Sequence, residues 1–222
     1  GLELDWMRFC HMFKRSEAVQ NTPLLTDFMI QMRSVLDQAA KKRGRDKLLL
    51  GVRVPPTIEE CRLLGFNLKA WVQQRLVDFI CPMDFAFTDY NTQTEDFTAL
   101  TKGTQCKVYP AIHSAYEDYT AWPTITGEYM QLETPENYRA AAKNFYAFGA
   151  DGVSAYNYQD HWIVEKHTDE WPRTLSYLTG LQSPAAVARG DRHYMYYPTR
   201  PRFPGVVAKH EKIVLDRKTD EP

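Results

Sequence analysis

Two carboxylates near the start of the chain have a spacing that suits glycosidic chemistry. Residues 2–7 alternate apolar and acidic side chains with a period of two, which predicts a strand with Glu3 and Asp5 on one face. Arg8 follows directly and can pair with Asp5, which would keep that carboxylate ionised. An ionised carboxylate in a fixed place can attack or stabilise an oxocarbenium-like centre. Asp5 is therefore the leading catalytic candidate, and the alternative is a structural ion pair at a strand end.

Hydrolysis of a glycosidic bond needs a second carboxyl group. Asp84 follows the apolar segment 77–82 at the expected end of a strand, so it is a candidate acid or base, or a sugar ligand; the alternative is an Asx turn. Glu59 and Glu60 open a predicted helix, where acidic side chains complement the helix dipole. Asp78 lies at the opposite end of its strand from Asp84, and we expect it to be structural.

Other polar and aromatic side chains occur on or just after the predicted strands, where they can bind sugar hydroxyls or stack on sugar rings. These candidate substrate-binding residues are Glu3, Arg8, Arg53, His113, Tyr116, Tyr156, Asn157 and Tyr158. For Glu3 the alternative is an ion pair inside the fold, and for Arg53 it is an ion pair there with Glu3 or Asp5. For Tyr156 the alternative is a place in the core.

The sequence predicts no cofactor and no metal centre. It contains no HExxH, EF-hand, GxSxG or P-loop pattern, and its histidines lack metal-ligand spacing. The four cysteines form no CxxC pair and are flanked by apolar or aromatic residues, which predicts buried free thiols. Cys81 is expected in the core and not as a nucleophile, because nothing near it lowers the pKa of a thiol.

Strand and helix signals alternate along most of the chain. Strands are predicted at 2–7, 47–54, 77–82, 106–113 and 152–157. Helix starts are predicted at Thr22-Pro23, Asn67, Thr94 and Thr134-Pro135, and a last helix over 170–178. This alternation indicates an α/β fold with a parallel sheet.

Two parallel architectures fit this pattern, a doubly wound sheet and a (β/α)8 TIM barrel. No glycine-rich strand-to-helix turn occurs, and polar residues cluster just past the expected carboxyl ends of the strands. We therefore predict a TIM-barrel fragment over 1–180, containing about the last five β/α units, with its strands parallel and adjacent in chain order. The chain opens directly on a strand, so the first three barrel strands are expected to precede it. Residues 181–222 are predicted to be an irregular tail or the start of a β-rich module, with a candidate strand at 212–216.

Composition excludes some classes of partner. The 222 residues carry a formal net charge of −1, which argues against nucleic acid or an anionic membrane as the main partner. No apolar run reaches the roughly 20 residues that span a bilayer. Aromatic residues make up 13% of the chain, which suits sugar stacking and suits a plain core equally well.

The segment GLELDWMRF resembles the fourth-strand signature of the family 10 glycosylhydrolase-like proteins, D-G-[IL]-x-[LF]-D-[YFW]-[IM]-R-[YF]. These are barrels related to the α-amylase superfamily. LVDFICPMDF, VYPAIHSAY and GADGVSAYNY are similar to the sixth, seventh and eighth strands of that family, in the same order. The resemblance covers residues 1–180 and implies a hydrolase of poly- or oligosaccharides, with Asp5 as a catalytic carboxylate and an extracellular or periplasmic location. The chain departs from the family at Cys10, where proline is common.

Two other functions stay open. One is a non-catalytic carbohydrate-binding or interaction protein on the same scaffold, in which Asp5 and Arg8 form a structural pair. The other is a barrel enzyme of different chemistry, such as a lyase acting on an acidic sugar, for which Arg53 and His113 would matter more. Carboxyl groups of Asp5 and Asp84 roughly 5–10 Å apart across an open lumen would favour hydrolysis.

Overall fold

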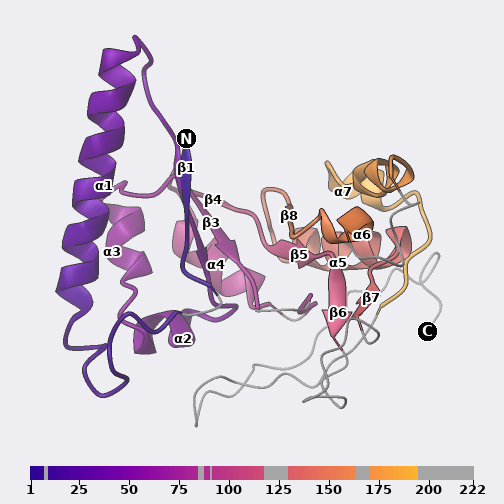
Figure 1. Ribbon diagram of the computed structural model, residues 1–222, viewed down its shortest axis with the longest axis horizontal. Coiled ribbons are helices and arrows are strands. Elements are labelled where there is room, and N and C mark those ends of the chain that lie inside the picture. Colours follow the sequence, from indigo (N-terminus) through magenta and orange to yellow (C-terminus); the bar gives the residue numbers. More distant parts are fainter. Residues whose placement is uncertain (8–9, 85–87, 91, 118–129, 164–170, 195–222) are drawn as a thin grey trace.

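The computed structural model describes residues 1–7, 10–84, 88–90, 92–117, 130–163 and 171–194, in which strands and helices alternate (Figure 1). The strands are β1 (Leu2–Asp5), β2 (Leu50–Val54), β3 (Phe79–Pro82), β4 (Lys107–Val108), β5 (Ala111–His113), β6 (Ala115–Glu117), β7 (Met130–Leu132) and β8 (Ser154–Tyr156). The helices are α1 (Thr22–Lys42), α2 (Ile58–Leu63), α3 (Leu68–Gln73), α4 (Thr94–Thr101), α5 (Pro135–Ala147), α6 (Asp160–Ile163) and α7 (Pro184–Val187), with the 3₁₀ helix η3 at Arg173–Leu178.

The parallel strands follow one another in chain order. β1 to β4 form one sheet, and β5 pairs in parallel with β8. Pro110 separates β4 from β5 because proline has no N–H to donate to the ladder. Hydrogen bonds nevertheless continue on both sides of this interruption. Tyr109 N–H donates to the Ile80 carbonyl of β3 at 2.9 Å, and Ser154 N–H of β8 donates to the Pro110 carbonyl at 3.0 Å. The predicted α/β class with parallel strands is confirmed, and the strands form a four-stranded sheet in chain order and a separate two-stranded sheet.

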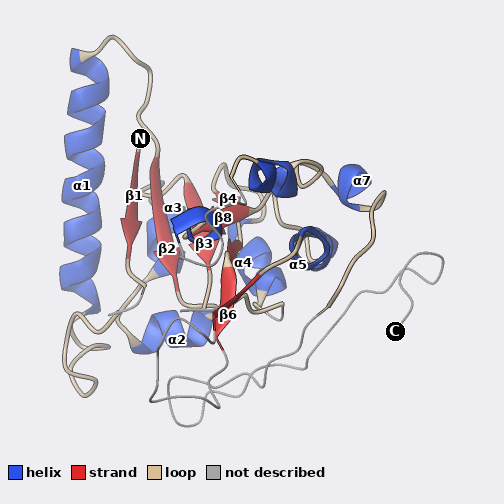
Figure 2. Ribbon diagram, turned by 45° about the vertical axis from the view of Figure 1, so that its right-hand side comes forward, coloured by secondary structure: helices blue, strands red, loops and turns tan. Residues whose placement is uncertain are grey.

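Two apolar cores hold the helices on these strands. β2 is buried along its whole length, and its Leu50, Val52 and Val54 pack with Leu25 and Met29 of α1. α1 and α3 lie side by side next to the β1–β4 sheet (Figure 2). The second core joins β5 to α5. The parallel strands are therefore covered by helices, as the alternating pattern predicts.

The cap signals in the sequence locate the helix starts to within one residue. The Thr134 hydroxyl accepts from Asn137 N–H at 3.3 Å, and the Asn137 side chain accepts from Thr134 N–H at 2.9 Å, which forms a capping box at the start of α5. Asn67 caps α3 as predicted. Thr22 and Thr94 are the first residues of α1 and α4, not their caps.

Several short elements differ from the prediction. β6 and β7 form an antiparallel hairpin that the sequence pattern did not predict, and the helix predicted over 170–178 is the 3₁₀ helix η3. These segments are too short to establish a hydrophobic period. The structure describes the predicted tail as far as residue 194, including α7, and the candidate strand at 212–216 lies outside the described residues. Within the described residues no helix is long and apolar enough to span a membrane.

Candidate active site at the carboxyl ends of the strands

Asp5 and Arg53 form a bidentate ion pair at the carboxyl ends of β1 and β2. The two residues lie opposite one another in the parallel register. Arg53 Nε donates to Asp5 Oδ1 at 2.8 Å, and Nη2 donates to Oδ2 at 2.7 Å. The Asp5 side chain is 48% exposed while that of Arg53 is 4% exposed, so the pair presents a carboxylate to solvent from a buried cation. Both contacts are charge-assisted hydrogen bonds, which fix the orientation of the carboxylate.

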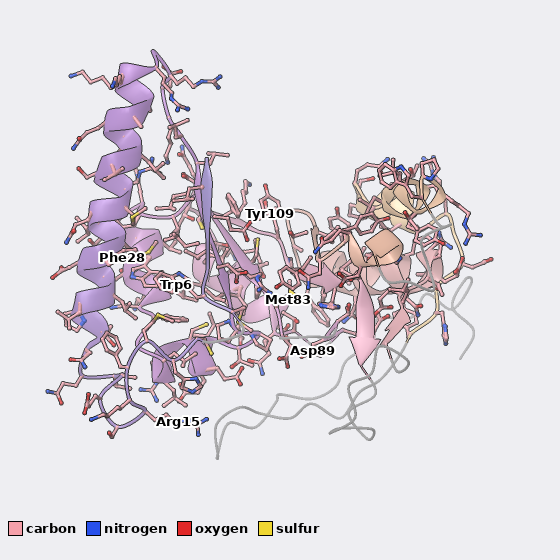
Figure 3. All side chains as sticks on the ribbon, viewed as in Figure 1. Trp6, Arg15, Phe28, Met83, Asp89 and Tyr109 are labelled. Atoms are coloured by element: carbon pink, nitrogen blue, oxygen red, sulfur yellow. The ribbon has the colours of Figure 1, made fainter. Side chains whose placement is uncertain are left out.

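Trp6, the residue directly after β1, points the other way. The Trp6 ring faces Phe28 of α1 at 5.8 Å between centroids, edge to face, and it also packs on Phe66 (Figure 3). The period-two pattern of residues 2–7 therefore places apolar and acidic side chains on opposite faces of the strand, as predicted. It anchors β1 to the helix layer through one face and leaves Asp5 on the other.

Arg53 links Asp5 to two further strands. Its Nη1 donates to Met83 Sδ at 3.1 Å, directly after β3. Its guanidinium lies over the ring of Tyr156, the last residue of β8, at 3.6 Å from the ring centroid, which is a cation–π contact. The Tyr156 ring is in turn 5.6 Å from the imidazole of His113, at the end of β5. Side chains from β1, β2, β5 and β8, together with Met83, thus meet at one end of the strands.

Glu3 lies one pleat behind Asp5. Among the described residues it has no ion pair, and register explains this, because Gly51 stands opposite Glu3 on β2. Burial raises the pKa of the Cys81 thiol, and the nearby Glu3 carboxylate raises it further. Cys81 is therefore a core thiol, as predicted, and all four cysteines are free and buried.

Two of the acidic candidates have structural surroundings. Asp78 accepts from Arg33 and from Leu50 N–H, and also pairs with Lys47, so it ties α1 and β2 to the amino end of β3 as predicted. Glu59 forms an exposed pair with Arg62 within α2, which fits a helix-start role.

Asp84 is buried at the carboxyl end of β3. It follows Met83, which contacts Arg53, so it lies in the part of the fold where the site gathers. The residues immediately after it, 85–87, are outside the described residues.

The structure separates the remaining binding candidates. His113 is buried beside Tyr156, whereas the Tyr158 ring packs between Tyr138 and His161 in a different cluster. Asn157 has a positive φ of 49° in the turn after β8. Arg8 and the side chain of Tyr116 lie outside the described residues. Of the two cations that the sequence offered to Asp5, Arg53 forms the ion pair, and the pair with Arg8 stays a prediction.

A buried polar cluster behind β5 was missed at the sequence level. Ser114 Oγ donates to Asp160 Oδ2 at 2.8 Å, and Tyr138 Oη and His161 Nε2 share a hydrogen bond of 2.9 Å. Glu133 lies beside them with 1% of its surface exposed. Burial raises the pKa of Glu133 to about 8, with the Thr88 hydroxyl opposing that shift. The sequence around the Thr134-Pro135 cap gives no sign that the carboxyl group of Glu133, the residue before it, is buried.

No metal site or family assignment emerges from this geometry. The described part of the chain contains no group of three or more His, Cys, Asp or Glu side chains that could hold a metal ion. No protein-family model matches the chain, and none of the curated proteins matches it in sequence.

Proposed function

We propose that this protein is a glycoside hydrolase of poly- or oligosaccharides on a TIM-barrel scaffold, of which this chain forms about the last five β/α units. One observation carries the proposal: a half-exposed carboxylate, Asp5, is held at the carboxyl ends of parallel strands in a bidentate pair with Arg53, whose guanidinium lies over the ring of Tyr156. Barrel enzymes carry their chemistry at this end of the strands. The resemblance of the strand segments to the family 10 glycosylhydrolase-like proteins supports the same reading.

In this proposal Asp5 is the nucleophile or the electrostatic stabiliser of the oxocarbenium-like transition state. Arg53 orients the Asp5 carboxylate, because Nε and Nη2 of its guanidinium both donate to it. Asp84 is the proposed second carboxyl, acting as acid or base. Tyr156 and His113 form the proposed wall for a sugar ring.

The lyase alternative is weakened by the contacts of Arg53. Recognition of an acidic sugar needs a cation with free donors, but Arg53 already donates to Asp5 and Met83 and has 4% of its side chain exposed. The same ion pair also fits the non-catalytic alternative, because a bidentate contact between two strands stabilises a scaffold. A measurement of activity is needed to distinguish a hydrolase from a carbohydrate-binding protein.

The test is hydrolysis of a panel of poly- and oligosaccharides by the full-length protein, measured as released reducing ends. The proposal predicts release from at least one member of the panel, and the anomeric configuration of the first product, read by NMR, distinguishes retention from inversion. Binding of a glycan without release across the whole panel would support the carbohydrate-binding alternative.

A further inference from the structure

The main chain places Glu133 beside the end of β5. Glu133 follows β7, and its N–H donates to the Ser114 carbonyl at 2.8 Å, one residue after His113. Its carboxyl is buried, and neither oxygen has a hydrogen-bond partner among the described residues. A buried carboxyl without a partner is costly when it is ionised, so the neutral form is favoured here.

The Thr88 hydroxyl lies close enough to lower the pKa of Glu133, and it also forms two hydrogen bonds with the main chain of His113. Thr88 Oγ1 accepts from His113 N–H at 3.0 Å and donates to the His113 carbonyl at 3.3 Å. We call these two hydrogen bonds the Thr88–His113 clamp. The clamp fixes the main chain of the residue whose imidazole faces Tyr156.

Among the residues that the structure describes, no cation forms an ion pair with Glu133. Tyr138 of α5 is close enough for Glu133 and Asp160 to raise its pKa, after burial, which is the larger cause. Tyr138 shares its hydrogen bond with His161, and Asp160 accepts from Ser114. An ionised Glu133 carboxylate would therefore accept a hydrogen bond from the Thr88 hydroxyl.

We propose that Glu133 is a proton switch for the candidate site: its neutral carboxyl leaves the Thr88–His113 clamp intact, and loss of its proton draws the Thr88 hydroxyl away from His113. A hydroxyl carries one proton, and a buried carboxylate is a stronger acceptor than a backbone carbonyl. Ionisation of Glu133 thus releases the His113 carbonyl and moves the imidazole relative to Tyr156. Burial, which raises the pKa of Glu133 to about 8, puts the switch at mildly alkaline pH.

The inference rests on the proposed function for its effect on activity, but its structural part can be tested separately. Full-length protein with isotope-labelled histidine is titrated by NMR from roughly pH 6 to pH 10, and the His113 signal is assigned from its loss in a His113→Gln variant. The wild type is expected to show a transition of the His113 signal near the Glu133 pKa of about 8. Glu133→Gln, which stays neutral, is expected to lack that transition. Glu136→Gln is the matched control and should keep it, because the Glu136 side chain is 40% exposed and pairs with Arg139.

Activity gives the second readout. Hydrolysis by the wild type should fall by pH 9.5 to roughly one thirtieth of its neutral value, the protonated fraction left for a group that titrates near 8. Glu133→Gln should lose this alkaline fall while keeping its activity at neutral pH. A His113 signal that titrates identically in wild type and Glu133→Gln overturns the switch, whatever the activity. Absence of hydrolysis on every glycan overturns the proposed function and leaves the NMR titration to decide the switch.

Discussion

At the residue scale, Asp5 and Glu133 show how surroundings separate two carboxyl groups. Asp5 is half exposed and receives two guanidinium donors, so its orientation is fixed. Glu133 is buried without a hydrogen-bond partner among the described residues, and burial raises its pKa to about 8.

Replacement of Asp84 tests whether it is the proton donor of the proposed reaction. Asp84→Asn should lower hydrolysis of natural glycans by about 10²–10⁴-fold, the usual contribution of a general acid. Aryl glycosides with a good leaving group need no protonation, so the variant should retain much more activity on them. Rates on both substrate types, compared with wild type, check this. An equal loss on both would assign Asp84 to sugar binding or to the fold.

Replacement of Glu133 should change how stability depends on pH. The folded protein keeps the Glu133 proton up to a pKa of about 8, whereas the unfolded chain loses it near 4.5. The stability that this proton adds is therefore complete below pH 4.5 and is lost as the pH rises through about 8. Glu133→Gln removes the dependence, so its stability relative to wild type should increase across this window by up to a few kcal/mol, on the order of 1.4 kcal/mol per pH unit. Urea unfolding at pH 5, 7 and 9 measures it, and parallel curves for the two proteins would contradict the burial of a protonated carboxyl.

At the scale of elements, register decides which side chains meet. β1 and β2 pair so that Asp5 faces Arg53 and Glu3 faces Gly51. Sequence reasoning left Arg53 with Glu3 or Asp5 as partner, because the period of a strand gives the face of a residue and not its level against the next strand. The capping signal at Thr134 is local, so it was predictable. The cation for Asp5 comes from 48 residues away along the chain, so the sequence offered it only as one of several possible partners.

Gly51 lets two strands pack closely on the face that carries Arg53. A Cβ built on Gly51 would overlap the ring of Phe79, which also packs on Tyr109. We expect Gly51→Ala to destabilise the protein by about 2 kcal/mol, a usual cost of overpacking. In a Phe79→Leu background the same change should cost at least ~1 kcal/mol less, because the smaller side chain makes room. Denaturant unfolding of the four proteins measures the coupling, and additive effects would argue against the close approach.

At the scale of the whole molecule, the order of the strands was the most predictable feature. Alternating strand and helix signals indicate parallel neighbours, and the segments at 2–7, 47–54, 77–82, 106–113 and 152–157 have that arrangement. The candidate site was predictable only as a region, the carboxyl ends of the strands. Its contacts depend on packing between distant segments, and the burial of Glu133 depends on how Thr88 and α5 close around it. No local pattern encodes either.

The ion pair of Asp5 makes stability alone a poor test of its role. Asp5→Asn keeps one acceptor oxygen for Arg53 but removes the charge, so we expect a loss of about 1 kcal/mol, or 2–4 °C in Tm, whether Asp5 is catalytic or structural. Asp151→Asn is a matched control, because Asp151 pairs with Lys107 at the amino end of β4, away from the site. The two variants should resemble each other in Tm and differ in activity.

The central claim is that the Asp5 carboxylate performs chemistry, and hydrolysis per folded molecule of Asp5→Asn tests it most directly. An amide cannot carry the negative charge that an oxocarbenium-like centre requires, nor act as a nucleophile. We predict that the rate falls by on the order of 10³-fold or more while the variant melts cooperatively and still binds the glycan. Asp151→Asn should keep nearly the full rate. Hydrolysis by Asp5→Asn within a few-fold of wild type, together with a lowered Tm, would contradict the account and leave Asp5 as a structural partner of Arg53.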